Sequence, residues 1–139
     1  LFSYKGRTIL VSGDTSKNAN LQQFAQGVDI LVHEALSATL VGILHDGAER
    51  AGNKNMARIT DDILNYHATP VEAAEIARDA GVGRLVYYHV VPPLILPGAE
   101  AAWLEGVGEV FENYTLSQDG TSFTLPPNSK EIIQTQEKI

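Results

Sequence analysis

The sequence contains no cysteine, which excludes disulfide bonds, thiolate catalysis and cysteine-ligated zinc for this chain. Any metal ion would therefore have to be held by histidine nitrogens and carboxylate oxygens. Only four histidines are available, namely His33, His45, His67 and His89. The sequence also lacks a run of about 18 apolar residues, so it predicts no membrane-spanning helix and no membrane partner.

Positive charge is scarce as well, because 10 Lys and Arg stand against 17 Asp and Glu and leave a formal net charge of −7. Phosphate binding depends on Lys and Arg that release counterions, so nucleic acid is not the favoured partner. Bound divalent cations would add positive charge locally and weaken that argument. The chain begins at Leu1 without an initiator Met or a signal-peptide pattern, which indicates a fragment and leaves a cytoplasmic or periplasmic location open.

Strand-like and helix-like segments alternate along the chain, which predicts an α/β fold with helices covering a sheet. The expected strands are 3–5, 8–11, 28–34 and 84–91, and the clearest helices are 18–26, 69–80 and 99–111. Between them, 36–44 and 59–66 have helical spacing, and 47–55 is expected to be a loop. Segments 114–117 and 122–125 are expected to form a closing hairpin. We therefore predict one domain over 1–125, followed by a polar, frayed tail over 126–139.

Polar side chains that could bind a metal fall at the ends of these strands. Asp14, the pair His33-Glu34, and His89 all lie at or just beyond carboxyl ends, and His67 directly precedes a helix. Ligand sites of such folds usually lie at this edge of the sheet. Taken singly, each residue has a simpler explanation, since Asp14 could cap the helix that follows it and His89 could be a packed histidine.

Four short motifs, in order, resemble one protein family. Gly13-Asp14-Thr15 is similar to the Gly-Asp-Thr motif of the ribonuclease Z and arylsulfatase branch of the metallo-β-lactamase superfamily. His33-Glu34-Ala35 and His67-Ala68-Thr69 resemble its His-Glu-Ala and His-Ser-Thr boxes, and 88–92 resembles its last metal-ligand motif. The likeness covers most of 2–125. It implies the second half of a four-layer αββα metallo-β-lactamase sandwich, classed as α/β or α+β, with a mixed sheet covered by helices.

The resemblance also implies a role for each site residue. Asp14 would bridge two metal ions and His89 would bind one of them, while Glu34 would orient His67 as the proton donor to the leaving group. The implied cofactor is two Zn²⁺ ions, although Mn²⁺ or Fe would also suit histidine and carboxylate donors. The implied reaction is attack by metal-bound hydroxide on a phosphoester or a sulfate ester. In the same motif, His33 would face the sheet interior and bond to backbone.

One part of the family pattern is missing from the chain. The His-x-His-x-Asp-His loop and a further histidine ligand normally lie upstream of the Gly-Asp-Thr strand. Asp14 and His89 alone give two ligands, whereas a catalytic zinc usually has three protein ligands and water. We therefore expect this chain alone to be inactive and to need an N-terminal half of the same domain. That half, or a second copy in a homodimer, would cover the apolar face of the sheet.

The substrate is the least determined part of this hypothesis. Pro92-Pro93 stand where the ribonuclease Z branch is expected to carry an Arg. Together with the acidic charge, this favours a small anionic ester. The first alternative is a tRNA 3′-processing endonuclease, that is, ribonuclease Z itself. The second is a truncated, non-catalytic interaction module that uses its sheet to bind a partner.

Overall fold

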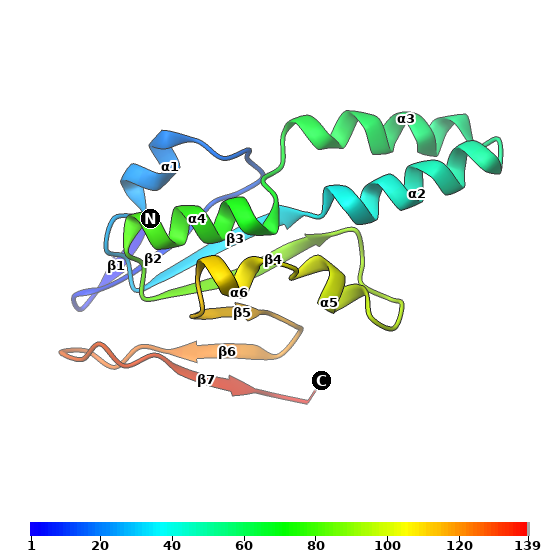
Figure 1. The fold of residues 1–139 in the computed structure, drawn as a ribbon. Helices are drawn as coiled ribbons and strands as arrows, with labels where there is room; N and C mark the ends of the chain where they lie inside the picture. Colours follow the sequence, from blue (N-terminus) through cyan, green and yellow to red (C-terminus); the bar gives the residue numbers. More distant parts are fainter. Residues whose placement is uncertain (139) are drawn as a thin grey trace.

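A computed structural model describes residues 1–138 of the chain. Five strands form one sheet in the order β1-β2-β3-β4-β5, and β6 and β7 form a second, two-stranded sheet (Figure 1). The strands are β1 (Phe2–Tyr4), β2 (Arg7–Val11), β3 (Ile30–Leu36), β4 (Arg84–Val91), β5 (Tyr114–Leu116), β6 (Thr121–Thr124) and β7 (Ile133–Gln136). The helices are α1 (Ala19–Phe24), α2 (Ala38–Arg50), α3 (Lys54–Asp62), the short 3-10 turn η1 (Ile63–Asn65), α4 (Pro70–Ala80), α5 (Ala99–Trp103) and α6 (Val107–Val110).

The main sheet is mixed, because β1 runs antiparallel to β2 while β2, β3, β4 and β5 are parallel. Its hydrophobic core lies on one face. Leu10, Leu31 and Leu85 are register partners on that face and pack with the buried side of α4 and with Trp103. Side chains alternate between the two faces of a strand, so these long parallel strands bury one set of residues under the helices. The predicted helix-covered mixed sheet is confirmed.

The helical hairpin α2–α3 extends away from the sheet and differs from the sequence prediction (Figure 1). The segment 47–55, expected to be a loop, contains the last turn of α2 and the start of α3. Asn53 explains the second helix, since its side chain accepts a hydrogen bond from the Met56 N–H and caps α3. The prediction of a loop was therefore wrong: Gly47 is tolerated within α2, and the break comes later, at 51–53.

The C-terminal region also departs from the prediction. Strand β5 joins the main sheet beside β4 and does not pair with β6 as a closing hairpin. The partner of β6 is β7, which lies in the segment 126–139 that we expected to be frayed. Arg7 helps to hold this segment in place, because its guanidinium donates hydrogen bonds to the backbone carbonyls of Pro126 and Glu131. Ile139, the last residue of the predicted tail, lies outside the described residues.

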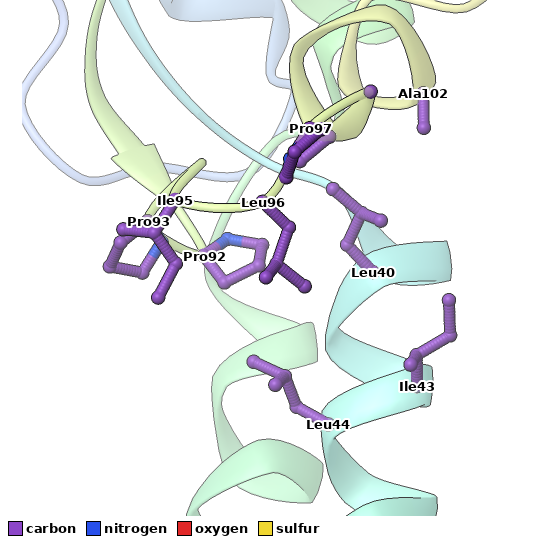
Figure 2. Close-up of a pocket in the computed structure, with 11 residues that line it drawn as sticks. Leu40, Ile43, Leu44, Pro92, Pro93, Ile95, Leu96, Pro97 and Ala102 are labelled. Carbon is purple, nitrogen blue, oxygen red and sulfur yellow. The ribbon is translucent and has the colours of Figure 1, made fainter.

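The predicted helix 99–111 is interrupted. Gly106 has a φ of 80°, a left-handed conformation, and it separates α5 from α6. Beside α5 an apolar groove of about 450 Å³ runs along α2 and the 92–98 segment (Figure 2). Its lining includes exposed Ile95 and Leu96 but none of the histidines. Within the described residues, no helix is both long and apolar enough to cross a membrane.

Candidate metal centre

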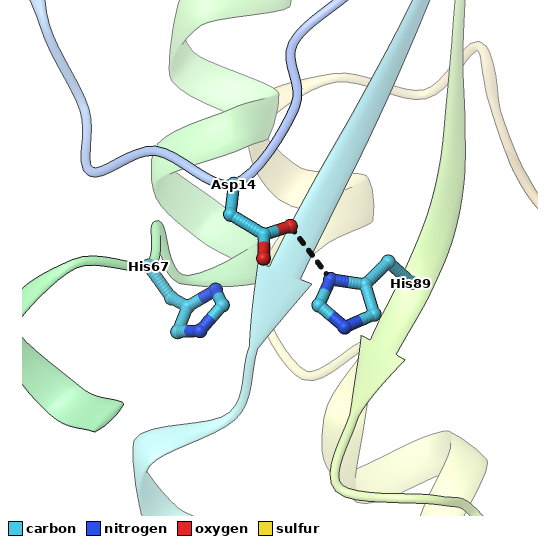
Figure 3. A group of neighbouring side chains, drawn as sticks. All are labelled: Asp14, His67 and His89. Carbon is cyan, nitrogen blue, oxygen red and sulfur yellow. Dashed lines mark ion pairs between the residues drawn. The ribbon is translucent and has the colours of Figure 1, made fainter. Parts of the chain in front are cut away.

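The carboxyl ends of β2 and β4 bring together the two residues expected to bind metal. Asp14 lies in the loop after β2, which turns at Gly13 with a φ of 65°. His89 lies near the end of β4, and its Nδ1 is 2.8 Å from Oδ1 of Asp14 (Figure 3). Both side chains are about half exposed, at 46% for His89 and 55% for Asp14. The two residues therefore meet at one accessible edge of the sheet.

An irregularity in β4 aims the His89 side chain. Pairing between β3 and β4 runs regularly to Glu34 and Tyr88 and then resumes with Ala35 and Val90, so His89 is left out of the register. His89 has a φ of 44°, which is unusual for a residue with a side chain. Such a bulge bends the strand and redirects one side chain. Here it turns His89 toward the Asp14 loop.

Glu34 connects the Asp14 loop to the segment that carries His67. Its side chain is fully buried, and Oε2 lies 2.9 Å from Nδ1 of His67. Oε1 accepts hydrogen bonds from the backbone N–H groups of Thr15 and Ala68, each at 3.2 Å. Both oxygens are thus committed, as a buried carboxylate requires. One side chain therefore fixes the loop after Asp14 and the residue after His67.

The start of α4 fixes His67 from the other side. Thr69 accepts a hydrogen bond from the Glu72 N–H, and the Glu72 carboxylate accepts one from the Thr69 N–H, so these two residues form a capping box. The hydroxyl of Tyr87 donates to the Pro70 carbonyl at 2.6 Å. Burial raises the pKa of Tyr87, so its hydroxyl keeps its proton and remains a donor. These bonds anchor the first turn of α4 to β4.

Asp14, His67 and His89 form a cluster that could hold a metal ion. Each offers a ligand atom, and these atoms all lie within 4.8 Å of one another (Figure 3). The ring centroids of His67 and His89 are 5.8 Å apart. One carboxylate and two imidazoles suit Zn²⁺, Mn²⁺ or Fe, so the donor set fits the implied cofactor. The pattern of motifs had assigned only two of these residues to the metal.

The remaining histidines lie outside this cluster. His33 is buried in β3, and its Nδ1 bonds to backbone, whereas His45 lies on α2 and contacts Thr60 of α3. The hydrogen bonds of Glu34 could not be predicted from the sequence, because two of its donors are backbone N–H groups. Capping at Thr69 was a visible signal that the residues before α4 are ordered. No comparable signal pointed to the N–H of Thr15.

Comparisons with known proteins give the relatives of this chain. No family model matches the sequence. Ribonuclease Z of Mycobacterium sp. (strain KMS) is 38% identical over 96 residues, which covers 69% of this chain and 30% of that protein. A putative ribonuclease Z of Mycobacterium tuberculosis (strain CDC 1551 / Oshkosh) is 36% identical over 98 residues, covering 70% of this chain and 38% of that protein. The chain thus spans about a third of the length of the curated relatives that it matches.

The solved structures give the fold. The crystal structure of the metallo-beta-lactamase fold protein YhfI from Bacillus subtilis superposes with a TM-score of 0.51 at 18% sequence identity, covering 78% of this chain and 35% of that one. The chain therefore has the fold of part of a metallo-β-lactamase-fold protein. More closely, it is ribonuclease Z-like, and it corresponds to the C-terminal part of that fold. Both statements confirm what the four motifs predicted.

Proposed function

We propose that this chain contributes one side of the active site of a metal-dependent hydrolase that cleaves phosphodiester bonds in RNA. The contact between Asp14 and His89 carries the proposal, because it joins a carboxylate and an imidazole from separate strand ends at an exposed edge. Ribonuclease Z relatives at 36–38% identity support RNA as the substrate. They favour the alternative of tRNA 3′ processing over the small anionic ester, which the sequence had put first.

The acidic charge of the chain does not outweigh these relatives. A net charge of −7 describes only the 139 residues of this chain, which match about a third of each relative. Binding of a phosphate backbone needs Lys and Arg at the contact and does not need a basic protein throughout. We therefore propose that the Lys and Arg side chains that bind the RNA backbone lie outside the Asp14, His67 and His89 cluster.

Each residue of the cluster has a distinct part in the proposed chemistry. Asp14 and His89 would hold the divalent cations, which supply Lewis acidity and activate water for attack on a phosphodiester. His67 has its Nδ1 committed to Glu34, which leaves Nε2 as the free atom of its ring. From there His67 would donate a proton to the leaving oxygen, a step worth about 10²–10⁴ in rate for a well-placed acid. Glu34 would fix the orientation of the imidazole through this hydrogen bond.

Metal content tests the ligands directly. We expect purified protein carrying Asp14→Ala or His89→Ala to lose bound metal, measured by elemental analysis. Matched controls are Asp46→Ala and His45→Ala, since both residues lie on α2 outside the cluster. His67→Ala separates two roles, because retained metal with lost activity indicates a proton donor and lost metal indicates a third ligand. Undiminished metal in both the Asp14 and His89 variants would overturn the metal centre.

Substrate class needs a separate comparison on the active protein. Three substrates distinguish the hypotheses: a precursor tRNA with a 3′ trailer, bis(p-nitrophenyl) phosphate and p-nitrophenyl sulfate. We expect precursor tRNA to be cleaved with the highest kcat/KM and the sulfate ester to be left intact. A preference for the sulfate ester would contradict RNA cleavage and favour an arylsulfatase-like hydrolase.

A further inference from the structure

His33 sits beside the proposed metal centre but belongs to the interior of the protein. It has no exposed surface, and it lies on the helix-covered face of β3 between Leu31 and Ala35. Its Nδ1 is 2.5 Å from the backbone carbonyl oxygen of Glu34. A carbonyl can only accept, so Nδ1 must carry the proton and donate it.

The other ring nitrogen explains why this hydrogen bond matters. Among the described residues, Nε2 of His33 is buried without a hydrogen-bond partner. An unsatisfied buried nitrogen is destabilising, and an apolar side chain at this position would avoid it. Burial also lowers the pKa of His33, although the Glu34 carbonyl and carboxylate oppose that shift, so the ring is neutral near neutral pH. What the imidazole provides here is therefore the single bond from Nδ1.

That bond is made where the sheet changes register. The carbonyl of Glu34 precedes Ala35, and the β3–β4 pairing shifts between these two residues, opposite His89. The N–H of Glu34 donates to the Ser12 hydroxyl at 3.2 Å, and that hydroxyl donates to the Gly13 carbonyl, next to Asp14. Both sides of the Glu34 backbone are thus held by side chains. Its carboxylate in turn holds His67.

We propose that His33 is a positioning residue for the metal centre. Its Nδ1–H bond to the Glu34 carbonyl holds the backbone at the register shift, and so keeps the Glu34 carboxylate on His67 and the His89 side chain on Asp14. The proposal rests on the proposed function, since positioning is useful only if the cluster binds metal. It assigns no contact between His33 and the metal or the substrate.

Two substitutions distinguish this bond from simple packing. In His33→Asn, the amide nitrogen is attached to Cγ as Nδ1 is, so a donor remains in place. In His33→Leu, a methyl group takes that position and the donor is lost. His33→Gln serves as a second variant should the leucine variant unfold, because it stays polar but moves its donor one bond further out.

The first readout is NMR of the metal-free chain, and it needs no activity. In His33→Leu we expect the ¹³Cα and ¹³Cβ shifts of His89 to move toward those of a regular strand, and the Nδ1–H resonance of His67 to shift or disappear. His33→Asn should retain both signals. The wild-type spectrum should also show His33 as the Nδ1–H tautomer.

The second readout is Co²⁺ binding followed by its visible absorption. Residues that orient ligands typically change metal affinity by about 10–100-fold, so we expect a loss of that size in His33→Leu and a value near wild type in His33→Asn. Unchanged His67 and His89 signals and unchanged affinity in His33→Leu would overturn the proposal, as would equal losses in the leucine and asparagine variants. A wild-type chain that binds no Co²⁺ while the NMR changes occur would refute the metal centre, and with it the proposed function, but would leave intact the finding that the His33 bond holds Glu34 and His89 in place.

Discussion

Glu34 and Asp14, the two carboxylates of the site, occupy opposite surroundings. Glu34 is fully buried, and its two oxygens accept from His67 and from two backbone N–H groups. Asp14 is 55% exposed, and its one side-chain ion pair among the described residues is with His89. Burial of a charge is tolerated only when its hydrogen-bonding capacity is filled, so Glu34 is committed to holding the fold together. Asp14 retains the free lone pairs that a metal ligand needs.

This difference divides the site into two pairs of residues: Glu34 and His67, which are buried and support the fold, and Asp14 and His89, which are exposed and available to bind a ligand. His67 and His89 repeat it, since the side chain of His67 is 6% exposed against 46% for His89. The buried pair should control the stability of the chain, whereas the exposed pair should control what it binds. Measurements of unfolding free energy on single variants test this division.

Glu34→Ala should have the largest effect. Removing the Glu34 carboxylate leaves His67 and the N–H groups of Thr15 and Ala68 without their acceptor, and a buried polar group left unsatisfied costs about 1–3 kcal/mol. We expect a loss of that order in urea unfolding of the metal-free chain. Glu109→Ala, an exposed glutamate on α6, is the matched control. A loss below about 1 kcal/mol in Glu34→Ala would contradict the supporting role, because ordinary surface substitutions stay within about 0.5 kcal/mol.

Asp29, which directly precedes β3, should lose its contribution to stability in acid. Burial raises the pKa of Asp29. The hydrogen bonds from Arg7 and from the N–H of Thr8, together with the charges of Arg7 and Lys130, lower the pKa by more than burial raises it, so the net shift is downward. A lowered folded-state pKa stabilises the protein above the unfolded value, about 3.9, and this stability is lost as the pH falls through the folded value. The wild-type advantage over Asp29→Asn in urea unfolding should therefore be full at pH 7 and shrink below about pH 4. An advantage that grows on acidification would contradict the assignment.

Thr69→Ala tests the support on the far side of His67. Loss of an N-cap typically costs about 1 kcal/mol, because one backbone N–H at the start of the helix loses its acceptor. We expect a decrease of this size in the unfolding free energy, smaller than that for Glu34→Ala. Thr69→Ser retains the hydroxyl and should lie near wild type. Equal losses in the two variants would show that the methyl group matters and not the cap.

Asp14→Ala should have the smallest effect on stability. Its side chain is exposed and, within residues 1–138, pairs with His89 alone, so we expect the unfolding free energy of the metal-free chain to change by less than about 0.5 kcal/mol. The same variant should fail to bind metal, as the proposed function requires. If Asp14→Ala destabilised the metal-free chain as much as Glu34→Ala, the two carboxylates would not have separate tasks.

The candidate site residues were easier to single out from the sequence than the segments around them. Asp14, Glu34, His67 and His89 could be singled out because short motifs place polar residues next to hydrophobic strands and caps. The loop predicted over 47–55 was wrong because polar composition there reflects an exposed helical hairpin. The hairpin predicted between 114 and 125 was wrong because strand pairing depends on long-range partners. Nothing local to β6 reveals that β7 is its neighbour.

Local sequence patterns are enough to predict the alternation of strands and helices, the helix cap at Thr69 and the metallo-β-lactamase relationship, because each depends on spacing within a few residues or on motif order. Three features emerge from the folded chain alone: Asp14, His67 and His89 share one cluster, His89 leaves the β4 register, and Glu34 ties the Asp14 loop to His67. These features join residues about 20 to 75 positions apart. Their geometry depends on how parallel strands align at one edge, which no short stretch of sequence specifies.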